Sequence, residues 1–284
     1  MPVHRAVALT GAVLSLVAVI IGCSAPGPAA SVGFVSVRTL DAGDGGVVAW
    51  GTFFGVAAGL PTSFRDDPYA AVLGGCEVAA AGEVARILDV PLHTHVRTPY
   101  DAGAALTLRT ADGATFATLP RRVDSSDAGE IISYVTPAPV PGPAPESLTL
   151  VVPGGRFPRF VGVEIPLAPD FDLLAPQGEE RATITASTRF EWESAGRTPA
   201  VVVLSISSED GADAVRCFAA DDGSFVLPAA TIDVLGPDFV GRLEAVGRAL
   251  YRVHHDAVED ATLVVAGTSV REFVYLPPLP TRLH

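Results

Sequence analysis

Short apolar segments rich in branched and aromatic residues recur along the chain, and clusters of Gly, Pro and Asp separate them. Segments of this kind are typical of β-strands, and their frequent turn signals argue against an alternation of strands and helices. The sequence therefore predicts an all-β protein of sandwich or barrel type. The expected strands cover residues 33–38, 47–56, 105–110, 114–119, 130–136, 147–152, 160–165, 181–186, 188–194, 200–207, 214–219, 224–228, 242–254, 262–267 and 269–276.

One of these segments, residues 242–254, fits two patterns. Leu243, Val246, Leu250 and Val253 have helical spacing, while a second apolar set alternates as in a strand. We favour the strand, because Gly247 lies in the middle and the surrounding segments are all β. A short helix is expected only near residues 83–88.

A proline-punctuated connector, "PLAPDFDLLAP" at residues 166–176, suggests a domain boundary. The fold class expected is two consecutive antiparallel β-sandwich domains, after a cleaved signal peptide and a short tether. The first domain would cover residues 32–168, the second 169–276, and residues 277–284 would form a tail. Without the leader, 284 − 22 = 262 residues remain, which is a comfortable length for two domains.

The first 22 residues have the composition of a secretory signal. Arg5 gives a positive start, and residues 6–21 are apolar apart from Thr10, Gly11 and Ser15. This run of 16 residues is shorter than the roughly 20 that a membrane-spanning helix needs. We predict a signal peptide at residues 1–22. The alternatives are an uncleaved signal anchor and an ordinary secretory signal cut nearby.

The end of the leader, Ile20-Ile21-Gly22-Cys23, resembles the bacterial lipobox. The resemblance implies that the leader is cleaved after Gly22 and that Cys23 is acylated on its sulfur and on its new amino group. Two or more acyl chains hold a protein stably on a bilayer without spanning it. Residues 23–31 would then be a lipidated tether. By the same resemblance, Ser24 in place of an aspartate implies the outer membrane.

The chain is acidic, with a formal net charge of −13 that becomes −14 once Arg5 is removed. Such a chain has no general electrostatic attraction to nucleic acid. We therefore expect no nucleic-acid partner.

Two cysteines remain after Cys23. Cys76 and Cys217 fall on opposite sides of the expected domain boundary, and Cys217 alternates with apolar neighbours as in a core strand. We expect two buried free thiols, since free cysteine is among the most buried residue types. The alternative is a bridge between them, which an oxidising compartment would permit.

The second half carries a wider resemblance. Trp192 in "FEWES", the valine-rich strand 200–206 and the hairpin "RCFAADDGSFVLP" are similar to an immunoglobulin or fibronectin III sandwich over residues 181–276. The whole chain resembles Gram-negative lipoproteins with two β domains, through "GGRFPRFVGVEIPLAPDFDLLAP" and "CFAADDGSFVLPA". This resemblance implies an architecture and an envelope location, and it carries no catalytic residue.

Two histidine groups are weak candidates for a metal site, namely His93 with His95, and His254 with His255 and Asp256. Imidazole and carboxylate are ligands that zinc accepts. The groups fall in different expected domains, however, and adjacent strand residues point to opposite faces. We therefore expect hydrogen-bonding roles, with no metal and no cofactor. The acidic runs 41–46 and 207–213 are interpreted as turns rather than calcium sites.

No catalytic motif is present in the sequence. A G-x-S-x-G elbow, a phosphate-binding P-loop and a G-x-G-x-x-G between strand and helix are all missing. Trp50, Phe53 and Phe54 are expected to pack in a core, although they could instead line a solute pocket. The proline-rich stretch 136–147 is expected to be a stiff surface loop, with a partner-binding motif as the alternative.

Together these features predict a lipid-anchored cell-envelope protein that binds or scaffolds and is not an enzyme. Its partner would be another envelope protein or a polysaccharide. The alternative is a lipid-tethered, metal-dependent hydrolase with a site between the two domains.

Overall fold

Strands account for nearly all of the regular structure, so the all-β prediction is confirmed. The computed structural model describes residues 30–40, 46–56, 62–79, 97–126, 129–177, 183–197, 199–208, 214–231 and 240–273. A short helix, α1 (Thr62–Asp66), accompanies the strands. The strands are β1 (Ala30–Leu40), β2 (Gly46–Val56), β3 (Cys76–Ala79), β4 (Arg97–Pro99), β5 (Ala105–Thr110), β6 (Thr115–Ser126), β7 (Gly129–Val135), β8 (Val140–Pro141), β9 (Leu148–Val152), β10 (Phe160–Ile165), β11 (Leu173–Ala175), β12 (Arg189–Trp192), β13 (Ala200–Ser208), β14 (Ala214–Ala220), β15 (Ser224–Val226), β16 (Gly241–Asp256) and β17 (Ala261–Glu272).

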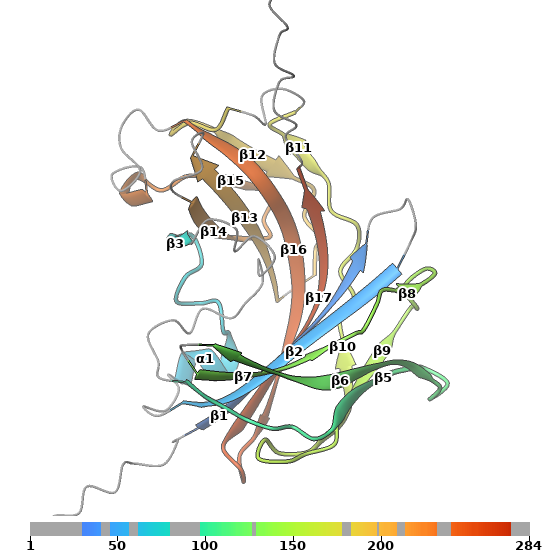
Figure 1. The fold of residues 1–284 in the computed structure, drawn as a ribbon. Coiled ribbons are helices and arrows are strands. Elements are labelled where there is room, and N and C mark those ends of the chain that lie inside the picture. The colour runs from blue at the N-terminus through green and yellow to red at the C-terminus, as the bar shows by residue number, and fades with distance from the viewer. Residues whose placement is uncertain are drawn as a thin grey trace, which may run out of the picture.

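Most strands belong to one 14-stranded sheet, whose order is β10-β9-β5-β6-β7-β2-β1-β17-β16-β13-β14-β3. Strands β4 and β8 also pair with β2, and a separate three-stranded sheet has the order β11-β12-β15. The long strands β16 and β17 run from the upper lobe, which contains the small sheet, into the lower lobe around β5–β10 (Figure 1).

The two halves of the chain meet where β1 pairs with β17. These strands run parallel in register from Ser31 opposite Ala261 to Thr39 opposite Ser269. The other strand pairs among the described residues are antiparallel, so this pair departs from the antiparallel expectation. The sheet therefore runs across the predicted boundary at residue 168, and residues 32–168 and 169–276 do not form separate sheets. The number of domains stays a prediction.

Local sequence could not have revealed this junction. A parallel pair needs a long crossover connection, and here the connection is the 220 or so residues between β1 and β17. Strand patterns identify the segments, but they carry no signal for a partner so far away along the chain.

Three hydrophobic cores lie on the two faces of the sheet. The first fills the curl of the N-terminal strands and is completed by Ala261, Leu263 and Val265 of β17. The second lies on the opposite face of β1 and β17, beneath Phe64 of α1 and Tyr69. The third lies between β13, β14 and β16 and the small sheet, with Trp192 between the layers. Residues from both halves of the chain contribute to the first two cores.

Strand β13 is apolar almost without interruption because both of its faces are buried. Val201 and Val203 face the second core, whereas Val202, Leu204 and Ile206 face the third. A strand that is covered on both faces has no solvated side, so alternation of polar residues disappears.

The large sheet also curls back on itself. Strand β10 at one end of the sheet contacts β16 and β17, and the chain after β10 crosses β17 at Gly267. A Cβ atom on Gly267 would lie 1.9 Å from the carbonyl oxygen of Pro166. Only glycine lets Pro166 pass this close to β17, and Pro166 and Leu167 line one wall of the groove described below.

Several local predictions can be compared with the structure. Residues 242–254 form part of β16, as expected, whereas 262–267 and 269–276 were predicted as two strands and belong largely to one, β17. The connector 166–176 contains β11, and the proline-rich stretch 136–147 contains β8, which pairs with β2. Segment 181–186 forms only an isolated bridge from Ile184 to Gly241 within its described part. The expected helix at 83–88 lies outside the described residues, and α1, β3 and β4 were not predicted.

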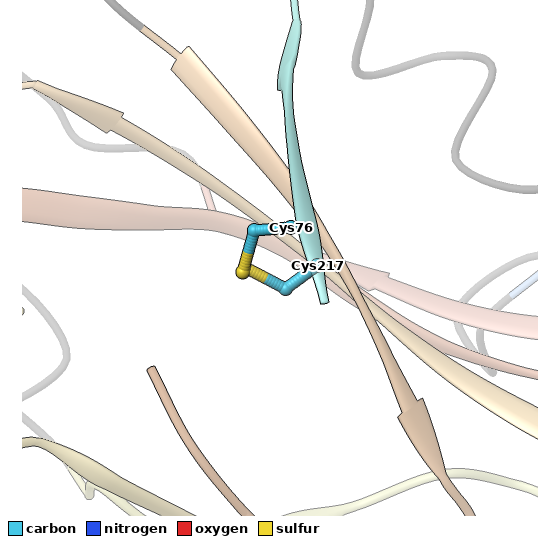
Figure 2. The surroundings of a disulfide bond; sticks show 2 residues. All are labelled: Cys76 and Cys217. Atoms are coloured by element: carbon cyan, nitrogen blue, oxygen red, sulfur yellow. A yellow bond between two sulfur atoms is a disulfide. The ribbon is translucent and has the colours of Figure 1, made fainter. Parts of the chain in front are cut away.

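The expectation of two free thiols is wrong. Cys76 and Cys217 form a disulfide with an S–S distance of 2.03 Å and a Cα–Cα distance of 4.0 Å (Figure 2). The error came from placing the two residues in different domains. Strand β3 instead pairs antiparallel with β14, and Cys76 lies directly opposite Cys217 in that pair.

The disulfide closes a long loop, because 141 positions separate its two cysteines. Replacing both residues, Cys76→Ala with Cys217→Ala, should lower the free energy of unfolding by about 2–5 kcal/mol, since the unfolded chain is no longer constrained. Guanidinium unfolding of the parent and the double variant measures the difference. Thiol labelling of the unfolded, unreduced parent provides the check: modification of both Cys76 and Cys217 would contradict the pairing.

Candidate functional site

A groove of about 420 Å³ lies where the lower lobe meets the upper lobe. One wall comes from the start of β9 and the end of β10, the other from the loop before β13, and β16 provides the floor. The residues that line it are Glu146, Ser147, Glu164, Ile165, Pro166, Leu167, Arg197, Pro199, Leu250, Tyr251 and Arg252. Residues from both halves of the described chain line this groove, so we take it as the candidate site.

Charged groups of both signs line the groove. Arg252 Nη1 lies 2.7 Å from Glu164 Oε2, and both side chains are about half exposed, at 48% and 54%. This ion pair connects β16 to β10 across the seam of the curled sheet. Glu146 and the exposed Arg197 add one charge of each sign. The groove can therefore offer both a cation and an anion to a polar ligand.

The floor of the groove is fixed by Tyr251. Its ring belongs to the second core, and its hydroxyl donates a hydrogen bond to Asp67 Oδ1 at 2.7 Å. Burial, and after it this hydrogen bond, raises the pKa of the Tyr251 hydroxyl. The phenol stays neutral and acts as a structural support beneath the groove.

His254 lies two residues beyond Arg252 on the same face of β16. It is paired with Leu263 of the first core, and its Nε2 atom is buried with no hydrogen-bond partner among the described residues. Burial lowers the pKa of His254, and the Arg252 guanidinium lowers it further, while Glu164 acts in the opposite direction. The side chain is therefore a neutral imidazole at the border of the core.

His255 and Asp256 have separate roles. His255 lies on the opposite face of β16 from His254, and its Nδ1 is 3.2 Å from the hydroxyl oxygen of Thr262. The carboxylate of Asp256 accepts hydrogen bonds from the backbone N–H groups of Val258 and Glu259 in the turn after β16. The sequence had grouped these three residues, and the strand geometry separates His254 from His255.

The other two histidines of the weak metal hypothesis, His93 and His95, lie outside the described residues. Within the described ranges, no three His, Cys, Asp or Glu side chains are grouped so that they could hold a metal ion. Cys23 also precedes the described part, which starts at Ala30. Among the residues that the structure describes, no helix has the length and apolar character needed to cross a membrane.

The three aromatic residues considered for a solute pocket pack in or against hydrophobic cores, which is the arrangement the sequence favoured. Phe53 is fully buried in the first core and Phe54 lies in the second. Trp50 packs against the second core, with its ring centroid 5.9 Å from that of Phe34.

A buried ion pair in the upper lobe was not foreseen. Arg248 Nε lies 3.0 Å from Asp221 Oδ2, and both side chains are only 4% exposed. Asp221 Oδ1 also accepts a hydrogen bond from Trp192 Nε1 at 2.9 Å. The guanidinium lies 4.9 Å from the ring centroid of Phe171. Arg248 lies among apolar residues in the middle of β16, and this position could have indicated a buried partner. The sequence around Asp221, however, suggested only a hairpin.

Comparisons with protein-family models, with curated proteins and with solved structures found no match for this chain.

Removing one partner of the buried pair should be costly. Asp221→Ala leaves the Arg248 charge buried without compensation, which should lower the free energy of unfolding by about 3–5 kcal/mol. The double variant Asp221→Asn with Arg248→Met should recover part of this loss. Glu191→Ala is the matched control, because the Arg189–Glu191 pair is exposed, and it should cost less than about 1 kcal/mol. Equal losses for Asp221→Ala and Glu191→Ala would contradict a buried role.

His254 should make stability depend on pH. Its folded pKa lies below the ordinary value of about 6.5, so the unfolded state binds the proton more readily as pH falls through that value. Stability should therefore decrease between about pH 7.5 and 5.5, and His254→Gln should make this decrease smaller. Denaturant titrations across that range measure it, with His255→Gln as the control on the opposite strand face. An unchanged slope in His254→Gln would refute the assignment.

Proposed function

We propose that this protein is attached to the cell envelope by lipid on Cys23 and acts by binding a partner rather than by catalysis. The observation that carries the attachment is the junction Ile20-Ile21-Gly22-Cys23 after a 16-residue apolar run. Lipid on this cysteine would hold residues 30–273 outside the cytosol, and Ser24 favours the outer membrane as the location.

The disulfide supports this location. Structural disulfides persist in secreted and periplasmic proteins and are rare in the reducing cytosol. Cys76 and Cys217 are paired in the sheet, and Cys217 is fully buried. Such a bond forms in the oxidising compartments outside the cytosol.

The groove supports a binding role. It is lined by Glu146, Glu164, Arg197 and Arg252 together with backbone and apolar side chains. Such a mixed lining suits a polar, extended ligand, and we propose a segment of another envelope protein or a polysaccharide. The upper lobe, with Trp192 between two sheets, supports the immunoglobulin-like or fibronectin III-like sandwich as part of the same proposal.

The attachment can be tested by exchanging the sulfur of Cys23 for a hydroxyl. The parent should be found in the membrane pellet and carry the mass of acyl chains, whereas Cys23→Ser should carry no acyl mass, because the sulfur that accepts the lipid is gone. Ser24→Thr is the control that keeps the cysteine. Retention of Cys23→Ser in the pellet, with no acyl mass on the parent, would refute the proposal.

The binding role needs a test of its own. A photo-crosslinking residue at Arg197, in the groove, should give reproducible adducts in intact envelopes. The same residue at Val161, which is 57% exposed on β10 and does not line the groove, is the matched control. Adducts that are the same from both positions, or none from Arg197, would count against the groove as the binding surface.

A further inference from the structure

The start of β1 and the turn between β16 and β17 form one end of the molecule, which we call the anchor end (residues 30–32 and 256–260). The backbone N–H of Ser31 donates a hydrogen bond to the carbonyl of Asp260 at 3.0 Å. Ser31 also pairs with Ala261 in the sheet, and Ala30 lies opposite Val56 of β2. The strand that follows the tether is thus held directly against the turn, at the lower end of the view in Figure 1.

The tether restricts how far this end can move from a bilayer. Six residues, 24–29, separate Cys23 from Ala30. Even a fully extended chain of this length spans only about 25 Å. Strand β17 has 12 residues and carries the sheet about 40 Å away from the anchor end. A lipid on Cys23 therefore keeps the anchor end near the membrane and lets the upper lobe stand away from it.

The tip of the anchor end carries an apolar side chain. Val258 is 91% exposed, which is more than any other large hydrophobic residue that the structure describes. The polar groups around it are mostly engaged: Asp256 accepts two backbone hydrogen bonds in the turn, and Asp260 lies 2.7 Å from Arg65. Glu259 is exposed beside the valine.

The charge of this end indicates which lipids it suits. The turn has three carboxylates, on Asp256, Glu259 and Asp260, and Arg65 compensates one of them. Anionic headgroups would repel such a surface. Zwitterionic headgroups would not, and they leave the exposed valine free to enter the interface.

We propose that the anchor end is a membrane-facing surface, with the Val258 tip in contact with the headgroup region of a zwitterionic bilayer. This rests on the proposed lipidation of Cys23. The upper lobe, with the small sheet β11-β12-β15, would then face away from the membrane.

The test places an environment-sensitive fluorophore on the single variant Val258→Cys, labelled without reductant so that the Cys76–Cys217 bond is preserved. Full-length, lipidated protein is bound to phosphatidylethanolamine–phosphatidylcholine vesicles that contain a headgroup spin-labelled lipid. Val226→Cys is the control, since Val226 is 50% exposed on β15 of the upper lobe. Quenching at position 258 should exceed that at 226 about twofold or more, because interfacial side chains lie roughly 5–10 Å into the headgroup boundary. Replacing part of the lipid with phosphatidylglycerol should reduce it.

A second arm separates this surface from the lipidation itself. A hexahistidine segment replaces residues 1–22, Cys23→Ser removes the acceptor, and a nickel-chelating lipid binds the tag. The geometry of the tether is retained whether or not the natural chain is acylated. Stronger quenching at 258 in this arm supports the membrane-facing surface even if native Cys23 carries no lipid. Equal quenching at both positions, or stronger quenching at 226, would overturn it.

Discussion

The parallel pairing of β1 with β17 is the interaction on which the rest of the structure depends. It joins the first strand of the described chain to the last, and it places β2 and β7 on one side and β16 and β13 on the other. The first core is completed by β17, and the second lies across both strands. Without this pair, the lower and upper lobes would share no sheet, and the wall of the groove next to β9 and β10 would not be held beside its floor on β16.

The same pairing relates the proposed membrane attachment to the proposed binding surface. Because β1 and β17 start side by side, the tether ends at the turn after β16. The groove lies on β16 at Leu250–Arg252, a few residues before that turn. The buried Asp221–Arg248 pair, next to the small sheet, is further still from the turn. Strand β16 thus fixes the positions of the groove and of the buried ion pair relative to the proposed attachment point.

Local sequence predicted the strands well and their partners poorly. Apolar and polar residues alternate in 105–110, because one face of that strand is buried. The run 200–207 is apolar almost throughout, because both faces of that strand are buried. The local sequence therefore indicates each strand. The choice of strand for 242–254 was also correct. The pairing of Cys76 with Cys217 and of Asp221 with Arg248 depends on the sheet order, which no local pattern encodes. The metal-dependent site between two domains, which the sequence offered as an alternative, stays a prediction. The charged lining of the groove was not anticipated.

Interstrand nuclear Overhauser effects in the deuterated, amide-labelled protein test the central claim most directly. The register predicts backbone contacts of Val35 and Val37 in β1 with the neighbourhoods of Val265 and Gly267 in β17, in addition to contacts of β1 with β2. Finding these contacts would establish the parallel junction. If β1 gave contacts only to β2, and β17 only to β16, the two halves would not share one sheet and the account would be wrong.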